Sequence, residues 1–251
     1  MHTYIIAEAG VNHNGQLDLA LKLCDVAKKA GVDCVKFQTW QTEKIVTHKV
    51  EKASYQSGNT HDTKESQFDM LKKLEISHEG FRIVQDHCKK IGIDFLSTPD
   101  EEYSLAFLMN ELNLPLIKIG SGEVTNIPYL RQIASYGKPI ILSTGMATLA
   151  QVAIAYDTLL TAGAPSVALL HCTTNYPCPK DEVNLRAMQT MKEAFKCQMG
   201  YSDHTMGTEI PIAAVAMGAE IIEKHFTLDR NMEGPDHKAS LEPQEYGRLY
   251  P

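Results

Sequence analysis

The chain has 251 residues, of which 43% are apolar and 22% charged, and this is the composition of an ordinary globular protein. Its net charge of −7 excludes a broadly basic surface for nucleic acid, and no run approaches the roughly 18 apolar residues of a membrane span. The six cysteines form no Cys-x-x-Cys pair, and no signal peptide precedes the first strand pattern. We therefore expect a cytoplasmic protein with neither nucleic acid nor a membrane as partner.

Strand-like and helix-like patterns alternate along the whole chain. The apolar runs typical of strands cover 4–9, 33–38, 94–97, 116–120, 139–143, 166–172, 198–202 and 220–226. Helical periodicity covers 17–30, 78–91, 101–113, 126–136, 148–162, 184–194 and 207–217. Such alternation gives a parallel sheet, and eight units in a chain of this length predict a (β/α)₈ TIM barrel. A doubly wound open sheet is the alternative, but no Gly-x-Gly-x-x-Gly motif follows the first strand.

Two parts of the chain depart from a regular barrel. The connection at about 39–74 is rich in Lys, Gln, Ser, Thr and Asn and is long enough for a functional loop or lid, with a solvated insertion as the alternative. The helix expected after the last strand begins near 243 and has only a few residues before the sequence ends, so we expect a truncated eighth helix. Residues 1–251 are predicted to form a single barrel domain.

Polar residues concentrate where the predicted strands end, which is the face that carries the active site in such barrels. Lys36 and Gln38 share parity on one strand, so their side chains face the same side. The candidates at strand ends are Glu8, Lys36, Gln38, Thr98, Lys118, Ser121, Glu123, Ser143, Tyr176, Ser202, His204, Glu223 and His225. Packing alone does not require them, and the sequence therefore predicts a catalytic cavity at this end.

Two of these candidates are lysines inside apolar strand patterns, where a lysine is rarely buried without an anion. Lys36 and Lys118, together with nearby hydroxyl groups and glycine-rich backbone, suit a phosphate group. Two adjacent ammonium groups would also lower each other's pKa. A Schiff base between either lysine and a carbonyl substrate therefore stays open.

Two histidines at neighbouring strand ends, His204 and His225, are candidate metal ligands. Two imidazoles with carboxylates or water, and without cysteine ligands, suit an octahedral ion such as Mn²⁺ better than structural zinc. His171 has no such partner and is interpreted as a core residue. Glu223 is interpreted either as a site residue or as the partner of a lysine inside the barrel.

Several ordered motifs resemble the bacterial N-acetylneuraminate (sialic acid) synthase family, including the legionaminic acid synthases. The matching motifs are Ala7-Glu8-Ala9-Gly10-Val11-Asn12-His13-Asn14-Gly15, Val35-Lys36-Phe37-Gln38-Thr39, Leu96-Ser97-Thr98-Pro99, Lys118-Ile119-Gly120-Ser121-Gly122-Glu123, Ser143-Thr144-Gly145-Met146, Tyr201-Ser202-Asp203-His204-Thr205, Glu223-Lys224-His225-Phe226-Thr227 and Gly234-Pro235-Asp236-His237. Any one of them would be weak, but their order along nearly the whole chain is highly specific.

The resemblance implies a metal-dependent condensation of phosphoenolpyruvate with an N-acylated amino sugar, giving a nonulosonic (sialic-type) acid and phosphate. The sugar would be N-acetylmannosamine or a related 6-deoxy diamino sugar. Phosphoenolpyruvate would be bound by Lys36, Thr98, Lys118, Ser121, Ser143 and Ser202, and the sugar by Gln38, Glu123, Tyr176 and Asp236. Glu8, His204 and His225 would be catalytic, with the two histidines holding Mn²⁺, or alternatively Mg²⁺ or Co²⁺.

The sequence departs from the family pattern in two places. Asp100 follows the Ser-Thr-Pro motif where many relatives have phenylalanine, which would alter the sugar pocket. Family members also continue into a C-terminal antifreeze-like domain, which supplies an arginine to the partner's sugar site in a homodimer. This domain is absent from the sequence. Two other functions remain open: another aldol-type barrel enzyme with a Schiff-base lysine, and a non-catalytic sugar- or anion-binding protein.

Overall fold

The computed structural model describes residues 2–60 and 64–247 and confirms the predicted barrel. Its eight parallel strands are β1 (Tyr4–Gly10), β2 (Cys34–Thr39), β3 (Asp94–Pro99), β4 (Ile117–Ile119), β5 (Ile140–Ser143), β6 (Val167–His171), β7 (Met199–Asp203) and β8 (Ile221–His225). Hydrogen-bonded neighbours run in the order β3-β2-β1-β8-β7-β6-β5-β4. The end strands β3 and β4 also lie side by side, which gives a nearly closed barrel.

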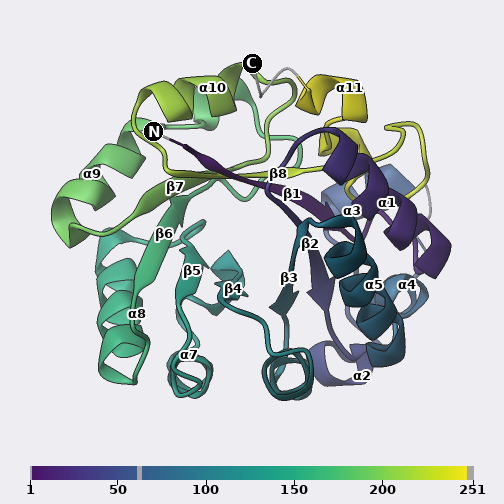
Figure 1. Cartoon of the computed structure of the whole chain (residues 1–251), viewed down its shortest axis with the longest axis horizontal. Helices are drawn as coiled ribbons and strands as arrows, with labels where there is room; N and C mark the ends of the chain where they lie inside the picture. Colours follow the sequence, from purple (N-terminus) through teal and green to yellow (C-terminus); the bar gives the residue numbers. More distant parts are fainter. Residues whose placement is uncertain (1, 61–63, 248–251) are drawn as a thin grey trace.

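Helices surround the strands (Figure 1). They are α1 (Leu17–Lys29), α5 (His78–Ile91), α6 (Glu102–Ala106) with a π-helical turn at Phe107–Glu111, α7 (Ile127–Ala134), α8 (Leu149–Thr161), α9 (Arg186–Phe195) and α10 (Glu209–Ala216). The 3.6-residue period places Ala20, Leu23 and Ala27 on the buried face of α1. All seven helices predicted from the sequence are confirmed.

Alternate residues of the strands point into the barrel and form two layers. The first layer is apolar and consists of Ile6, Cys34, Leu96, Ile141, Ala168, Leu170 and Ile221. Two residues further along, with the same parity, lie Glu8, Lys36, Thr98, Ser143, Glu223 and, just after β6, Cys172. Lys118 of β4 and Ser202 of β7 contact this second set and belong to the same layer. The two-residue period of a strand thus stacks a polar layer on an apolar layer, toward the end where the strands finish.

The connection between β2 and α5 contains three short helices that the sequence analysis did not predict: α2 (Thr42–Ile45), α3 (Ser54–Thr60) and α4 (Gln67–Leu74). Helices this short depend on tertiary packing more than on periodicity. Trp40, Met70 and Leu74 pack with Val11 from the loop after β1. Asn59 donates a 2.6 Å hydrogen bond to the carbonyl of Pro235. These contacts place the segment over the end of the barrel that carries the polar layer.

Beyond β8 the chain forms α11 (Pro243–Tyr246), a single turn where the eighth helix was expected. Tyr246 is buried, packs edge-on against Phe226 and donates its hydroxyl to the carbonyl of Lys224. Residues 248–251, on which the rest of the expected helix falls, lie outside the described part of the chain. Within the described ranges, no helix has both the length and the apolar character to cross a bilayer.

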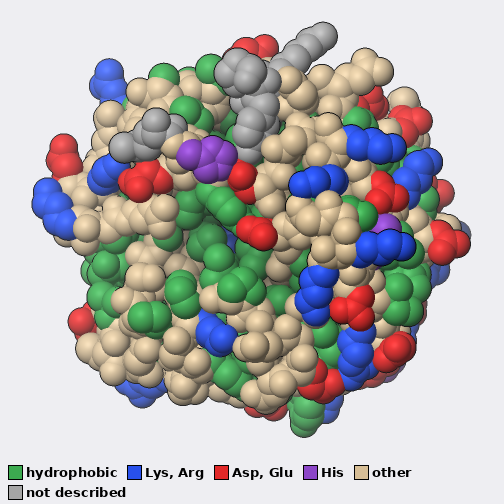
Figure 2. Space-filling model, viewed as in Figure 1, with side chains coloured by type: hydrophobic (Ala, Val, Ile, Leu, Met, Phe, Trp, Pro, Cys, Tyr) green, Lys and Arg blue, Asp and Glu red, His purple; other side chains and the backbone are tan. Residues whose placement is uncertain are grey.

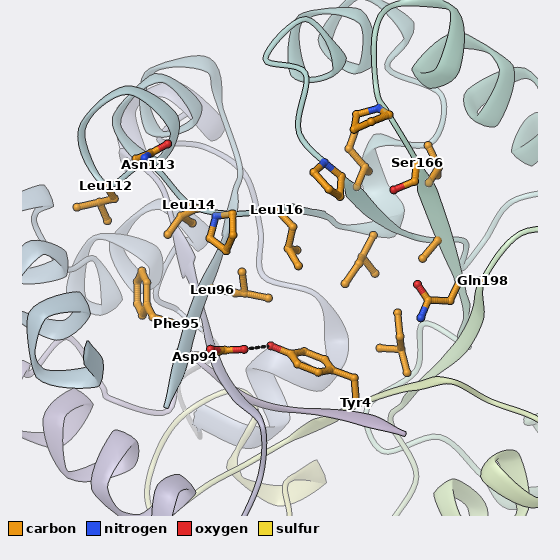
Figure 3. A pocket seen from close by; sticks show the side chains of 18 of the residues that line it. Tyr4, Asp94, Phe95, Leu96, Leu112, Asn113, Leu114, Leu116, Ser166 and Gln198 are labelled. Atoms are coloured by element: carbon orange, nitrogen blue, oxygen red, sulfur yellow. Dashed lines mark hydrogen bonds between the residues drawn. The ribbon is translucent and has the colours of Figure 1, made fainter. Parts of the chain in front are cut away.

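A cavity of about 1140 Å³ lies at the opposite end of the barrel, where the strands begin. Figure 3 shows Tyr4 directed toward Asp94 in this cavity, and its hydroxyl donates a 2.6 Å hydrogen bond to that carboxylate. Leu96, Ile141 and Ile221 line the cavity and also belong to the apolar layer. The apolar layer therefore separates this cavity from the polar layer. In the orientation of Figure 1, apolar side chains gather at the middle of the molecular surface (Figure 2).

Gly200 allows β7 and β8 to approach closely. A Cβ atom on Gly200 would lie 2.3 Å from the carbonyl oxygen of Ile221 and 2.6 Å from a methyl group of Leu170. We expect Gly200→Ala to lower the free energy of unfolding by about 1–3 kcal/mol through overpacking, measured by urea denaturation. Gly58→Ala is the control, since its Cβ would meet nothing within 4 Å. Equal midpoints for Gly200→Ala and the wild type would contradict the expectation.

Candidate active site

The polar layer is built around two buried lysines and two buried carboxylates. Lys36 Nζ lies 2.6 Å from Glu8 Oε2 and 3.7 Å from Glu223 Oε2. Lys118 Nζ lies 3.4 Å from Glu223 Oε1. None of the four side chains is more than 8% exposed. Glu223 of β8 therefore joins the lysines of β2 and β4 across the inside of the barrel.

The pKa values of the two lysines are shifted in opposite directions. Burial disfavours the charge of Lys36, but the carboxylates of Glu223 and Glu8 outweigh burial and raise its pKa. Burial lowers the pKa of Lys118, and Glu223 offsets this effect only in part. The lowering expected from an adjacent cation is therefore seen at Lys118, where Lys36 contributes to it, whereas the two carboxylates leave the pKa of Lys36 raised.

The two carboxyl groups also differ. Burial opposes ionisation of Glu223, but the ammonium groups of Lys118 and Lys36 outweigh burial and hold its pKa at about 2. Burial raises the pKa of Glu8, and Lys36 counteracts this effect only partly. The lowered pKa favours the ionised form of Glu223 near neutral pH, whereas the raised pKa of Glu8 makes this carboxyl group the readier of the two to take up a proton.

Three hydroxyl groups complete the surroundings of this cluster. Lys36 donates to Thr98 Oγ1 at 3.1 Å, and Lys118 donates to Ser143 Oγ at 2.8 Å. Ser202 donates to Glu223 Oε1 at 3.2 Å. The structure therefore brings together five of the six residues predicted to bind phosphoenolpyruvate.

The sixth residue, Ser121, lies to one side of the lysine cluster. Its hydroxyl oxygen lies 3.2 Å from Cys172 Sγ and accepts a 2.9 Å hydrogen bond from the backbone N–H of Gly145. Cys172 directly follows β6, has inward parity and lies within electrostatic reach of Lys118. No role was predicted for Cys172 from the sequence, although its position at the end of a strand is the same signal that identified the other residues.

Two imidazoles lie beside the lysine cluster. The ring centroids of His204 and His225 are 5.6 Å apart, and the ring of Tyr176 packs 4.1 Å from that of His204. His204 Nδ1 lies 2.6 Å from the carbonyl oxygen of Thr173. Burial lowers the pKa of both histidines, so both rings are neutral near pH 7.

These two rings are compatible with a divalent cation. The hydrogen bond from Nδ1–H of His204 to the Thr173 carbonyl leaves the lone pair on Nε2, and His225 Nδ1 is buried without a hydrogen-bond partner. No group of three or more His, Cys, Asp or Glu side chains suitable for a metal occurs within the described ranges. The protein would therefore supply His204 and His225, and water or substrate would supply the remaining ligands. His171 lies outside the barrel interior and contacts the Val183 carbonyl at 2.8 Å.

The four predicted sugar-binding residues lie at different depths. Gln38 donates a 3.0 Å hydrogen bond to Glu8 Oε1, and Asp236 Oδ2 lies 3.9 Å from His225 Nδ1. Burial and the charge of Glu8 raise the pKa of Asp236 to about 7. Tyr176 packs on the imidazoles. The fourth residue, Glu123, is partly exposed near the rim, where its carboxylate accepts from Asn126 at 2.7 Å.

A second cavity has a volume of about 900 Å³. It is lined by Asn59 and Thr60 of α3, by Pro177 and Met206, and by residues 230–233 with Lys238. Pro177 follows Tyr176 in the chain, and Lys238 follows Asp236 by two positions. Two of the predicted sugar-binding residues are thus near lining residues in the chain, although neither of them lines the cavity itself.

Asp100, which follows β3, has inward parity and contributes a further carboxyl group to this end of the barrel. Burial raises its pKa to about 7, Lys36 lowers it, and Glu123 and Glu8 raise it further. Its backbone N–H donates to the carbonyl of Thr39 at 3.1 Å, which holds it beside β2.

Replacement of Asp100 by asparagine is expected to change the pH dependence of stability. Because the folded pKa is raised from 3.8 to about 7, the stabilising contribution of the protonated group is complete below pH 3.8 and is lost as pH rises through 7. Asparagine does not titrate, so the free energy of unfolding of Asp100→Asn should rise by about 2.5 kcal/mol relative to that of the wild type between pH 5 and pH 8. Urea denaturation at both pH values measures the difference. Asp86→Asn, a substitution at an exposed position on α5, should show the same pH dependence of the free energy of unfolding as the wild type. A difference in stability between Asp100→Asn and the wild type that is equal at both pH values would refute the expectation.

The fold and the site define a (β/α)₈ barrel with a cluster of buried charged side chains at the ends of its strands. The chain belongs to the NeuB family, whose model matches residues 23–250. It is 55% identical over 249 residues to the N,N′-diacetyllegionaminic acid synthase of Campylobacter jejuni, an alignment that covers 98% of this chain and 74% of that protein. It is 47% identical over 253 residues to the enzyme of the same name from Legionella pneumophila, covering 99% and 70% of the two chains.

The fold is similar to that of a solved relative. The crystal structure of the N-acetylneuraminic acid (sialic acid) synthetase from Leptospira borgpetersenii, in complex with citrate, has a TM-score of 0.87 and 36% sequence identity to this chain. The superposition covers 99% of this chain and 81% of the Leptospira chain. These similarities confirm the family named from the sequence motifs, and the chain is a synthase-like enzyme.

Proposed function

We propose that the protein condenses phosphoenolpyruvate with an N-acylated amino sugar in its open-chain aldehyde form, producing a nonulosonic acid and phosphate. The preferred acceptor is a 6-deoxy sugar with two acetamido groups rather than N-acetylmannosamine. This preference is supported by the 55% and 47% identity to two N,N′-diacetyllegionaminic acid synthases.

The observation that carries the proposal is the pair of buried lysines joined by Glu223. Each ammonium group faces a carboxylate on one side and has further N–H donors, which a phosphate group would accept from. Ser143 and Thr98 already contact the lysines and offer further hydrogen bonds. In so enclosed a site, the attraction between ammonium and phosphate is much stronger than it is in water.

Glu8 is proposed to move the protons of the reaction. A carbon–carbon bond forms between the methylene carbon of phosphoenolpyruvate and the aldehyde carbon, and water adds to the carbon that bears the phosphate. Glu8 accepts a proton from this water and returns one to the former aldehyde oxygen. The carbon–oxygen bond to phosphate then breaks, the hydroxyl group left on that carbon becomes the ketone, and its proton leaves with the phosphate. Its raised pKa brings its proton affinity closer to the pH at which the enzyme works.

His204 and His225 are proposed to hold Mn²⁺, with Mg²⁺ or Co²⁺ as alternatives. Such an ion would polarise the aldehyde oxygen, where negative charge develops. Tyr176 packs against both imidazoles and fixes their orientation. Gln38, Asp236 and Glu123 are proposed to bind the sugar.

The assembly and the setting are also part of the proposal. We propose a homodimer in a reducing cytoplasm, as the family resemblance implies. All six cysteines are free thiols and five of them are buried. Reduced thiols in the core suit a reducing compartment.

The test is a condensation assay with Mn²⁺, phosphoenolpyruvate and each acceptor, in which released phosphate and the nonulosonic acid are quantified. Lys118→Met should weaken phosphoenolpyruvate binding by roughly 10- to 150-fold, since a charge-assisted contact contributes about 1.5–3 kcal/mol. Titration calorimetry measures this affinity. Lys52→Met, which removes another buried lysine but one paired with Glu65, is the matched control. Equal donor affinity in both variants and the wild type would refute the anion site.

A Schiff-base mechanism at Lys118 remains the second candidate, because burial lowers the pKa of this amine. Borohydride reduction in the presence of substrate distinguishes the two functions. A covalent adduct of Lys118, found by peptide mass spectrometry, would favour the Schiff base. We expect the reduced protein to keep its original mass.

A further inference from the structure

The end of the β7–β8 pair alternates between residues inside the barrel and residues outside it. Ser202 lies opposite Glu223, and Asp203 lies opposite Lys224. Ser202 and Glu223 point inward and share a 3.2 Å hydrogen bond. Asp203 and Lys224 have the opposite parity, so they point toward the helices and do not belong to the polar layer.

Asp203 and Lys224 form an ion pair whose two side chains are 0% exposed. Lys224 Nζ donates to Asp203 Oδ2 at 2.5 Å and to the carbonyl of Thr205 at 2.7 Å. Asp203 accepts from the backbone N–H of Thr205 at 3.0 Å and from its hydroxyl at 3.2 Å. The ammonium group of Lys224, the residue before His225, thus contacts Asp203 and Thr205, the residues on either side of His204.

Stability alone does not account for this pair. Removing two charges from water is costly, and well-packed apolar residues of similar volume are often as stabilising as a buried ion pair, or more so. An apolar pair, however, cannot form the hydrogen bonds that hold Thr205 and Asp203 against Lys224. The hydroxyl of Tyr246 holds the backbone of Lys224 from the other side.

We propose that Asp203 and Lys224 are positioning residues that set the separation of the His204 and His225 rings, and thereby the affinity of the site for a divalent cation. The inference rests on the proposed metal site and extends it. The pair touches neither substrate nor metal, since it lies on the other face of the strands.

The test compares Mn²⁺ affinity with phosphate affinity in the metal-free full-length chain. Free Mn²⁺ is followed by electron paramagnetic resonance, and inorganic phosphate is titrated by calorimetry as a probe of the lysine side of the site. The double variant Asp203→Leu/Lys224→Met should bind Mn²⁺ at least tenfold more weakly, as expected when partners behind metal ligands are lost. Phosphate affinity should stay within twofold of the wild type. Lys52→Met, which breaks another buried ion pair, should change neither affinity.

Lys224→Arg keeps the charge and tests the same idea in a variant that is expected to fold. A longer, planar cation alters the spacing of the two strand ends, so Mn²⁺ affinity should fall at least threefold. Near-UV circular dichroism verifies the fold of each variant. Unchanged Mn²⁺ affinity in folded Lys224→Arg would overturn the inference, whatever the double variant does. If the wild type itself binds no Mn²⁺, the proposed metal site is wrong, and the inference that rests on it is wrong too. If the wild type binds Mn²⁺ and His204→Ala does not, the metal site stands, and the Lys224→Arg result then tests the positioning role alone.

Discussion

Glu8→Gln is expected to lower kcat by roughly 10²- to 10⁴-fold, the usual contribution of a general acid–base group. The amide keeps the shape of the side chain and can still contact Gln38 and Lys36, but it cannot take a proton from water. Burial raises the pKa of Glu8, so activity of the wild type should rise with pH through a value above the ordinary range of glutamate. Steady-state rates of phosphate release measure both effects.

Affinity for phosphoenolpyruvate should survive this substitution. Lys36 loses one carboxylate partner in Glu8→Gln but keeps Glu223, and Lys118 is untouched. Glu65→Gln is the matched control, because Glu65 is also paired with a buried lysine, Lys52. A Glu8→Gln enzyme with nearly normal kcat would show that another group moves the protons.

Removing divalent cations with a chelator should abolish condensation while lowering the melting temperature by only a few degrees. The reason is structural: the backbone carbonyl of Thr173 already holds His204, and the buried pair of Asp203 and Lys224 holds the adjoining strand ends. The ion is therefore not needed to fold the barrel. Differential scanning calorimetry and the phosphate-release assay, before and after addition of Mn²⁺, measure the two quantities.

Two histidine variants make this test specific. His204→Ala should reproduce the effect of the chelator and should not be rescued by Mn²⁺. His171→Ala, which changes a buried histidine on the outer face of β6, should retain Mn²⁺-dependent turnover. Full activity in the chelated wild type would exclude a metal-dependent reaction, whereas wholesale unfolding on chelation would indicate a structural ion.

The barrel and most of the site could be predicted because both follow from local patterns. Eight strand–helix alternations predict the topology, and parity with position at a strand end predicts which side chains face one cavity. Lys36, Lys118 and His225 were found in this way. The family motifs added the substrates, which parity cannot provide.

What the sequence could not provide is the pairing of side chains across the barrel. Nothing in the local pattern indicates that Glu223 lies between the two lysines, since that depends on the stagger of β8 against β2 and β4. The displacement of Ser121 toward Cys172 depends likewise on the turn that follows β4. The short helices α2, α3 and α4 owe their existence to packing on the barrel rather than to periodicity.

The apolar layer beneath the lysines has a consequence for the order of events. Leu96, Ile141 and Ile221 lie beneath the lysines and separate them from the cavity at the other end of the barrel. In the proposed reaction, phosphoenolpyruvate lies on Lys36 and Lys118, and the sugar lies near Tyr176, where the strands have ended. We therefore expect phosphoenolpyruvate to bind before the sugar, and phosphate to leave after the new acid.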